Sequence, residues 1–224
     1  MKFVGLNVWG DSIAKGVVFD ETRGRYAICR ENCLMKLSRE AGISIENYSV
    51  MGQTSDAGLE RMRSGNGLAQ GRVAVIEYGG NDCDIDWRAA SENPEAFHDG
   101  KVPLDRFARN LTEMVRRARE ANMLPVLVTP PPLVAQRYFD WVRKGLNGEN
   151  IMKYLGDVER IYRWQEGYAE QVRTLAEKLN VMLVDIRSRM LESGKLEDLI
   201  CLDGIHPNAK GHEVIYGAVA PLLT

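Results

Sequence analysis

The chain has 224 residues, of which 45% are hydrophobic and 27% are charged, a composition typical of an ordinary soluble globular protein. Its 29 basic and 31 acidic residues give a formal net charge of −2. This balance provides no electrostatic attraction to nucleic acid or to an anionic membrane, so we expect neither as a partner. The length suits one domain, residues 1–224, with a large buried core.

The sequence favours a cytoplasmic protein with reduced thiols. Its first residues lead directly into a predicted strand, without the basic and apolar regions of a signal peptide, and no apolar run is long enough to cross a bilayer. Cys29 and Cys33 lie four residues apart in a predicted helix. Because no Cys-x-x-Cys pair occurs and no histidine lies near them in sequence, we expect all four cysteines to be small apolar side chains rather than metal ligands.

In the first half of the chain, segments whose apolar residues have the spacing of a strand alternate with segments whose apolar residues have the spacing of a helix. The expected elements are a strand at 2–8, a helix at 26–40, a strand at 43–50, a helix from about 55 to 63 and a strand at 72–78. The next segment, 83–102, is irregular and polar, which indicates an excursion over the surface.

The second half continues the alternation. The expected elements are a helix at 104–121, a strand at 124–129, a helix at 158–179, a strand at 181–186, a short helix at 188–199 and a last helix from about 207 to 222. A second excursion, rich in aromatic residues, occupies 133–156. Five strands that alternate with helices predict an open parallel sheet with helices on both faces.

Small and polar residues follow three of the predicted strands, at the edge where open parallel sheets bind ligands. Gly10-Asp11-Ser12 follows the first strand, Gly52 the second and Gly80-Asn81-Asp82 the third. A fourth cluster, Asp203-Gly204-Ile205-His206-Pro207, precedes the last helix and could fold onto the same edge. Their convergence predicts a functional site there.

Ser12, His206 and Asp203 are the residue types of a nucleophilic hydrolase. The hydroxyl of Ser12 would attack a carbonyl carbon, and His206 would take the proton and later return it to the leaving group. Asp203 would hold the imidazole in one tautomer. The tetrahedral intermediate needs hydrogen-bond donors, for which the backbone N–H groups of Ser12 and Gly52 and the amide of Asn81 are candidates.

In order and approximate spacing, these four segments resemble the blocks of the SGNH (GDSL-type) hydrolase superfamily over nearly the whole chain. The resemblance implies Ser12 as nucleophile, Gly52 and Asn81 in the oxyanion hole, and Asp203 and His206 as the rest of the triad. It also implies a flavodoxin-like α/β/α sandwich of three layers around a five-stranded parallel sheet, with no metal or organic cofactor.

The sequence departs from the family pattern at Ile13, where the family name has leucine, and in the two excursions, which are longer than in minimal members. Aromatic residues of the excursions could line an acyl or sugar pocket, or they could cover the rim of the sheet or form a subunit contact. The substrate-binding candidates are Trp87, Tyr138, Phe139 and Trp141. Trp164 and Tyr168, four residues apart on a predicted helix, are expected in the core.

Two polar patterns carry no predicted function. Asp82, Asp84 and Asp86 alternate, but they lack the glycine turn and the later bidentate glutamate of a calcium loop, so we expect a solvated loop and no metal site. His212 lies six residues after His206, a spacing that does not place two ligands on one helical face.

The sequence predicts a serine esterase that cleaves a small or carbohydrate-borne acyl ester through an acyl-enzyme intermediate, with a small-molecule ester as its partner and homo-oligomer formation left open. A thioesterase or lysophospholipase with the same triad would need a long apolar acyl groove. A non-catalytic ligand-binding module would not require the serine, asparagine, aspartate and histidine together. A flavodoxin-like nucleotide or flavin protein would need a glycine-rich phosphate cradle, which the first loop lacks.

Overall fold

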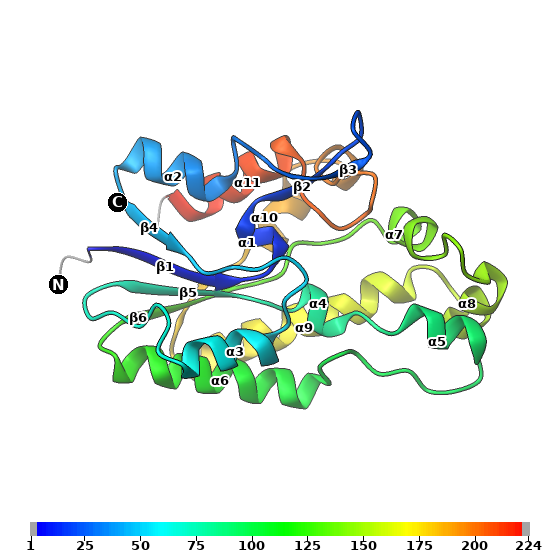
Figure 1. The fold of residues 1–224 in the computed structure, drawn as a ribbon, viewed down its shortest axis with the longest axis horizontal. Helices are drawn as coiled ribbons and strands as arrows, with labels where there is room; N and C mark the ends of the chain where they lie inside the picture. Colours follow the sequence, from blue (N-terminus) through cyan, green and yellow to red (C-terminus); the bar gives the residue numbers. More distant parts are fainter. Residues whose placement is uncertain (1–3, 221–224) are drawn as a thin grey trace.

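The computed structural model describes residues 4–220 and contains one five-stranded parallel sheet between two layers of helices (Figure 1). Its strands are β1 (Gly5–Gly10), β4 (Ser44–Asn47), β5 (Val73–Glu77), β6 (Leu124–Val128) and β7 (Met182–Val184). They lie in the order β4-β1-β5-β6-β7, and every neighbouring pair is parallel. This is the flavodoxin-like order, and it confirms the predicted fold class.

Helices cover both faces of the sheet (Figure 1). One layer contains α2 (Cys33–Ala41), α10 (Ile186–Glu192) and α11 (Ala209–Val219), and the other contains α3 (Ser55–Arg63), α6 (Leu104–Glu120) and α9 (Arg160–Lys178).

Side chains of β1 alternate between the two layers because successive residues of a strand point to opposite faces. Leu6 and Val8 belong to the core beneath α2 and α11, whereas Trp9 belongs to the core beneath α3 and α6. Every residue of β1 is buried, as expected for a central parallel strand covered on both faces.

A helical lobe, formed by α5 (Trp87–Glu92), α7 (Ala135–Val142) and α8 (Gly148–Leu155), extends beyond the carboxyl ends of the strands, on the right of Figure 1. It has its own apolar core, which includes Leu133, Phe139 and Ile151. The expectation of irregular excursions at 83–102 and 133–156 was therefore wrong for these helices. Each has at most eight residues, too few for a clear 3.6-residue periodicity to emerge.

The predicted helix at 26–40 begins too early. Residues Arg25–Ile28 form β3, which pairs antiparallel with β2 (Val17–Asp20) in a hairpin. Helix α2 starts only at Cys33, where the side chain of Asn32 caps it by accepting a hydrogen bond from the N–H of Met35 at 3.0 Å. Cys29 therefore lies outside the helix, and the prediction that one helix contains both Cys29 and Cys33 was wrong.

Other boundaries differ by a few residues. The strand expected at 43–50 is confined to β4, and the helix expected at 188–199 divides into α10 and a 3₁₀ turn at Leu196–Asp198. Two further short helices, α1 (Ser12–Lys15) and α4 (Gly80–Cys83), follow β1 and β5. The predicted strand residues 2–3 and the predicted end of the last helix at 222 lie outside the described residues.

Candidate active site

Ser12 stands at the carboxyl end of β1, as the first residue of the one-turn helix α1. Asp11 caps this helix, because its carboxyl oxygen Oδ1 accepts the N–H of Ile13 at 2.8 Å. Gly16 ends the helix in the left-handed region, with φ of +79°. The sequence Gly10-Asp11-Ser12 thus converts a buried strand into a tight turn that presents the serine at the edge of the sheet.

Ser12, His206 and Asp203 form one hydrogen-bonded line, although 194 residues separate the serine from the histidine. The Nε2 atom of His206 lies 2.8 Å from Oγ of Ser12, and its Nδ1 atom lies 2.5 Å from Oδ2 of Asp203. All three side chains are buried. With Nδ1 protonated and bonded to the carboxylate, Nε2 is free to accept the serine proton.

The loop that carries Asp203 and His206 is fixed by its own backbone. The other carboxyl oxygen of Asp203 accepts the N–H groups of Ile205 and His206, each at 3.2 Å. Burial alone would raise the pKa of Asp203, but the hydrogen bond and charge of His206, together with these N–H groups, hold it below its usual value. The carboxylate is therefore charged at neutral pH.

Gly204, between these two residues, has φ of +83° and packs so closely against the backbone of Tyr138 that a Cβ atom would collide with it. Only glycine fits both the conformation and the contact. The active-site loop is thereby seated on the first turn of α7, which joins the triad to the helical lobe.

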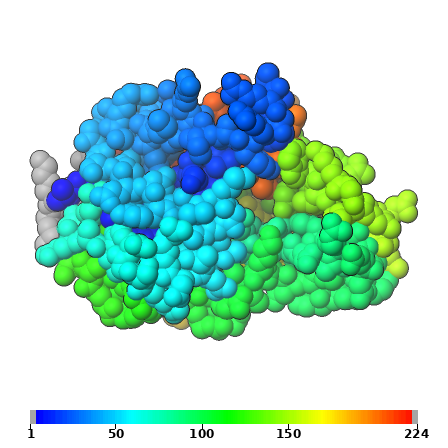
Figure 2. Space-filling view, in the orientation of Figure 1, coloured from blue at the N-terminus to red at the C-terminus, as the bar shows by residue number. Residues whose placement is uncertain are grey.

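The β2–β3 hairpin covers the histidine. The ring of Tyr26 lies 5.1 Å from the ring of His206, centroid to centroid, and Trp141 of α7 packs edge-on against Phe19 and Tyr26. At the surface, the blue hairpin lies beside the yellow-green α7, with part of the orange C-terminal segment visible between them (Figure 2). Burial, with the charge of Asp203, raises the pKa of Tyr26 to about 12, so its hydroxyl is neutral beside the triad.

Asn81 approaches the serine from the neighbouring strand, at the point where the strand order of the sheet reverses. It lies on α4, directly after β5, and its amide donates a hydrogen bond to Oδ2 of Asp11 at 2.9 Å. One amide hydrogen is thus held by Asp11, and the other is available to a ligand in the cavity that Asn81 and Ser12 line together.

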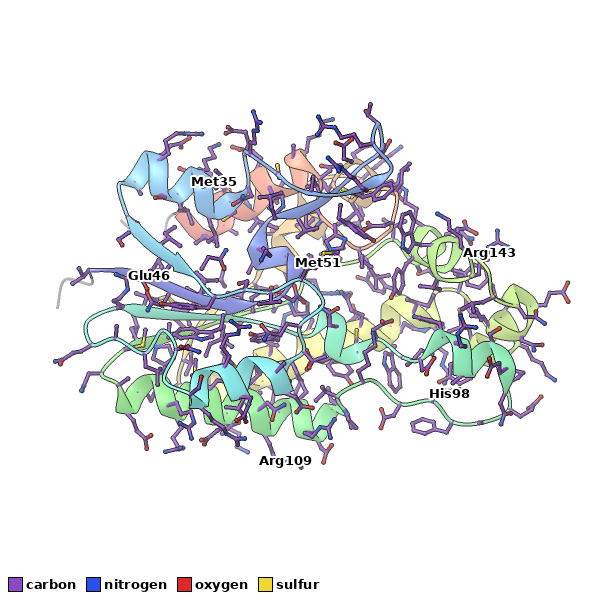
Figure 3. All side chains as sticks on the ribbon, viewed as in Figure 1. Met35, Glu46, Met51, His98, Arg109 and Arg143 are labelled. Atoms are coloured by element: carbon purple, nitrogen blue, oxygen red, sulfur yellow. The ribbon has the colours of Figure 1, made fainter. Side chains whose placement is uncertain are left out.

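Gly52 lies in an exposed turn after β4, with φ of +76°. Its neighbour Met51 is seen near the carboxyl end of β1, while His98 and Arg143 lie on the helical lobe (Figure 3). Gly52 is on the expected edge of the sheet, but it is not among the residues that line the cavity at Ser12. Its role in an oxyanion hole stays a prediction.

A cavity of about 80 Å³ opens beside Ser12 and extends into the helical lobe. Near the serine its wall is polar, and towards the lobe it is mainly apolar and aromatic. The apolar part is lined by Ile85, Trp87, Leu133, Tyr138, Tyr154, Leu155, Ile161 and Trp164.

Two of the four predicted substrate-binding aromatics, Trp87 and Tyr138, line this cavity. The other two are placed elsewhere: Phe139 is buried in the core of the lobe, and Trp141 packs against the hairpin. Trp164, expected in the core, also lines the cavity and donates its indole N–H to the carbonyl oxygen of Cys83 at 2.8 Å.

The alternating aspartates are not a solvated loop, so that expectation was wrong. Asp82 is completely buried, where it accepts the N–H of Ser55 at 2.9 Å, and burial raises its pKa to about 7. Asp84 lines the cavity, and Asp86 caps α5. Within residues 4–220, no group of three or more His, Cys, Asp or Glu side chains is arranged to hold a metal ion.

Asp84 and Tyr26 are the site residues that sequence reasoning missed. The carboxylate of Asp84 accepts the indole N–H of Trp87 and the hydroxyl of Tyr138, each at 2.7 Å, and so fixes both aromatic side chains. Tyr26 could have been found from the apolar runs at 17–20 and 25–28, which flank a short loop ending in glycine and are typical of a hairpin.

Residues 8–214 match the family described as the GDSL-like Lipase/Acylhydrolase family. The chain belongs to this family. An isoamyl acetate-hydrolyzing esterase 1 homolog from Bos taurus is 26% identical over 72% of this chain and 59% of its own length. A GDSL esterase/lipase from Arabidopsis thaliana is 26% identical over 66% of this chain and 57% of its own length. The chain thus spans less than two thirds of the length of these two relatives.

Solved structures of other proteins share the fold. The lipase/acylhydrolase from Enterococcus faecalis superposes with a TM-score of 0.71 at 18% identity, over 98% of this chain and 95% of that one. A catalytic mutant of an acetylxylan esterase from Geobacillus stearothermophilus superposes with a TM-score of 0.65 at 20% identity, over 100% of this chain and 96% of that one. No helix in the described part of the chain has the length and apolarity needed to cross a membrane.

Proposed function

We propose that this GDSL-family chain is a serine esterase that cleaves a small or carbohydrate-borne acyl ester through an acyl-enzyme intermediate. The observation that carries the proposal is the line from Oγ of Ser12 through the ring of His206 to Asp203, with distances of 2.8 and 2.5 Å. The substrate is a small-molecule ester, and the proposed reaction uses side chains and backbone N–H groups of this chain together with water.

In the acylation step, Oγ of Ser12 attacks the carbonyl carbon of the ester while its proton moves to Nε2 of His206. The C=O double bond becomes a C–O⁻ single bond in the tetrahedral intermediate. When the tetrahedral intermediate collapses, the C–O bond to the alcohol breaks, and the alcohol leaves with the proton that His206 returns. The buried charge of Asp203 stabilises the imidazolium formed in between.

The oxyanion is held by donors that are in place before substrate arrives. Asn81 and Ser12 line the cavity from two adjacent strand ends, so we assign the free amide hydrogen of Asn81 and the backbone N–H of Ser12 as donors, with Gly52 as the third candidate. A preorganised donor of this kind contributes about 3 kcal/mol to the stability of a transition state. The hydrogen bond from Asn81 to Asp11 fixes the amide in advance.

Deacylation repeats the same proton path with water. His206 removes a proton from a water molecule as its oxygen attacks the acyl carbon of the ester on Ser12. Collapse of the second tetrahedral intermediate releases the carboxylic acid and returns the proton to Oγ of Ser12. The free enzyme is thereby regenerated.

The size of the cavity favours a short acyl group over a long one. Its volume of about 80 Å³ is bounded by aromatic and branched side chains of the lobe, which limits the room for an acyl chain. The names of two similar proteins refer to acetate esters, isoamyl acetate and acetylxylan. We therefore expect acetyl esters to be cleaved faster than long-chain acyl esters or acyl thioesters.

The test is hydrolysis of p-nitrophenyl esters of increasing chain length by the wild type and the Ser12→Ala variant. We expect the wild type to prefer acetate and Ser12→Ala to lose activity by several orders of magnitude while its circular dichroism is unchanged. Ser64→Ala, an exposed serine, is the control and should retain full activity. Near-wild-type turnover by Ser12→Ala would refute the proposal, and a preference for long chains would favour the thioesterase or lysophospholipase alternative.

A further inference from the structure

A second cavity, of about 540 Å³, lies between the sheet and the layer of α2, α10 and α11. Its wall on the sheet side consists of residues from β1, β5, β6 and β7, and most of them are valines. Val75, at the middle of the central strand β5, stays partly exposed beneath the helices. The short valine side chains thus leave this layer hollow, and the volume falls within the range of ligand pockets, about 300 to 1,000 Å³.

The cavity is long, and a carboxyl group lines it near the carboxyl edge of the sheet. On β6 its wall extends from Leu124 to Val128, which is about 13 Å at the usual rise of a strand. Because alternate residues of a strand share a face, Glu77 at the end of β5 points to the same side as Val75. Its Oε2 atom would lie 3.2 Å from a Cβ atom on Gly10, so the carboxyl packs over the strand end that precedes Ser12.

His212 lines the cavity from the opposite wall. It lies in the first turn of α11, six residues after His206 at the carboxyl edge, and Ile215 and Val219 follow it on the same helical face. Glu77 is 3% exposed and His212 is 1% exposed. The cavity therefore has an apolar length and a buried polar end.

Both polar side chains lack a hydrogen-bond partner among the described residues, at both carboxyl oxygens of Glu77 and both ring nitrogens of His212. The carboxyl of Asp11 and the N–H of Ala14 lie near Glu77, and the backbone of Val17 lies near His212, but none of them has the geometry of a hydrogen bond. A buried polar group without a partner costs free energy. The partner that these two groups need must come from a molecule in the cavity.

The lining determines the chemistry of that molecule. Valine, leucine and isoleucine side chains favour an alkyl chain, and smaller apolar cavities than this one bind apolar molecules. At the polar end, a hydroxyl group can donate to a carboxyl oxygen or a ring nitrogen and can accept from an imidazole N–H. A charged head group is disfavoured by the apolar surroundings, which also raise the pKa of Glu77 and lower that of His212 to about 4.

The turn that carries the nucleophile separates this cavity from the catalytic one. Ser12 and Asn81 line only the catalytic cavity, whereas Ala14, Glu77 and His212 line only the second. The side chain of Ile13 lies between them and lines both. A molecule in the second cavity would thus lie behind α1, on the other side of the turn from the reacting atoms.

We propose that the second cavity binds a neutral single-chain amphiphile, an aliphatic alcohol, with its hydroxyl group at Glu77 and His212 and its alkyl chain along the valines of the sheet. The site goes beyond the esterase function proposed above and does not depend on it.

Isothermal titration calorimetry of the wild type with n-decanol tests the binding directly. We expect one molecule per chain, bound more than about a hundredfold more tightly than n-hexanol, which buries four fewer methylenes. Decanoate and decylammonium should bind at least about tenfold more weakly than n-decanol, because their charges would be buried. No saturable binding of n-decanol, or equal affinity for the charged analogues, would overturn the proposal.

Val126→Phe tests whether the alkyl chain lies along the sheet. Its larger ring enters the cavity, so n-decanol should bind at least about tenfold more weakly, while hydrolysis of p-nitrophenyl acetate stays within about twofold of the wild type. Val142→Phe, on α7, is the control, because Val142 lines neither cavity. Undiminished binding by a folded Val126→Phe would contradict the proposed path of the chain.

The double variant Glu77→Leu, His212→Leu tests the polar end. Apolar replacement of buried polar groups that lack partners need not destabilise the fold. We expect the affinity for n-decanol to fall by about tenfold, the effect of one lost hydrogen bond, while its ratio to the affinity for n-hexanol is unchanged. Wild-type affinity in this variant would show that the hydroxyl group binds elsewhere.

Carbon-13 methyl NMR of the wild type locates the alcohol without any variant. Addition of n-decanol should shift the methyl signals of Val75, Val126 and Val184 and leave those of Leu133 and Leu155, which line the catalytic cavity, in place. Shifts confined to the two leucines would place the alcohol at the catalytic site and overturn the proposal. Because neither this spectrum nor calorimetry measures ester hydrolysis, a failure of the esterase function would leave both results valid.

Discussion

The carboxyl edge of the sheet and the helical lobe face each other across one cavity, but they are built in different ways. The edge holds Ser12, Asn81 and His206 by backbone caps, tight turns and buried carboxylates, and each side chain has a specific hydrogen-bond partner. The lobe, α5, α7 and α8, surrounds its own apolar core and lines the cavity largely with aromatic and branched residues.

This difference separates two tasks. Groups that follow directly from strands of a rigid sheet are suited to hold reacting atoms at fixed distances, on which catalysis depends steeply. Side chains of the lobe set the shape of the cavity, on which the choice of acyl group depends. Changes at the sheet edge should therefore lower turnover of every ester, whereas changes in the lobe should alter the preference among esters.

The largest of these effects is expected from Asp203→Asn, which removes the charge that orients His206. We expect kcat to fall by about 10²- to 10⁴-fold for all esters, since the imidazole loses its fixed tautomer and its counter-charge. Esterase assays across the chain-length series check this, with Asp99→Asn at an exposed position as the control. A loss confined to one acyl length would contradict the division of tasks.

The same variant tests stability against pH. The folded-state pKa of Asp203 lies below its usual value, so the carboxylate stabilises the fold above its unfolded pKa of about 3.9 and loses that contribution as the pH falls through the folded value. Urea unfolding should give a constant difference in free energy between wild type and Asp203→Asn from pH 8 to 5, and a smaller one below about pH 4.

Asn81→Ala should produce the next effect. Removal of one oxyanion donor lowers kcat by about 10²- to 10³-fold. KM should change little for any ester, because the amide acts on charge that develops only in the transition state. Asn66→Ala, at an exposed position, is the matched control. A large rise in KM with unchanged kcat would instead make Asn81 a ground-state binding residue.

In the lobe, Leu155→Ala should change selectivity rather than turnover of the best ester. Leu155 lines the cavity, and its truncation should shift the ratio of butyrate to acetate hydrolysis towards butyrate by about tenfold, the effect of one or two methylenes in an apolar pocket. Ile151→Ala is a close control, because Ile151 belongs to the same core but does not line the cavity.

Both lobe substitutions should destabilise the fold by about 2–5 kcal/mol, the usual cost of truncating a buried leucine or isoleucine. Selectivity should change only in Leu155→Ala. An equal shift in both variants would mean that general loosening of the lobe, rather than the wall of the cavity, controls the preference.

The smallest effect is expected from Tyr138→Phe. It removes one of the two donors to Oδ1 of Asp84, while the indole of Trp87 and the ammonium of Lys101 continue to hold that carboxylate. We expect a loss of about 1 kcal/mol in the free energy of unfolding and a change of only a few fold in KM. Tyr216→Phe, remote from the cavity, is the control, and a loss of turnover comparable to that of Asn81→Ala would place Tyr138 among the catalytic groups.

The same contrast governs what the sequence predicts. Buried strands such as 72–78 show continuous apolar runs, and the residues after them lie at one edge by topology alone, so the positions of Ser12 and Asn81 followed from pattern. The loop of His206 follows no strand, and its place at this edge was expected only as one way for the loop to fold. The lobe and the hairpin could not be predicted from such a pattern, because their short elements are defined by caps such as Asn32 and by contacts such as that of Tyr26 with His206. Those contacts join residues far apart in sequence, which no local periodicity records.

The most direct test of the central claim is reaction of the wild type with a fluorophosphonate, followed by peptide mapping in a mass spectrometer. The account predicts one adduct per chain, on the peptide that contains Ser12, together with complete loss of esterase activity. Ser12→Ala should take up no label, and His206→Ala should react far more slowly, because its serine has lost its base. An adduct on another residue that abolishes activity, or an active enzyme that no fluorophosphonate labels, would contradict Ser12 as the nucleophile.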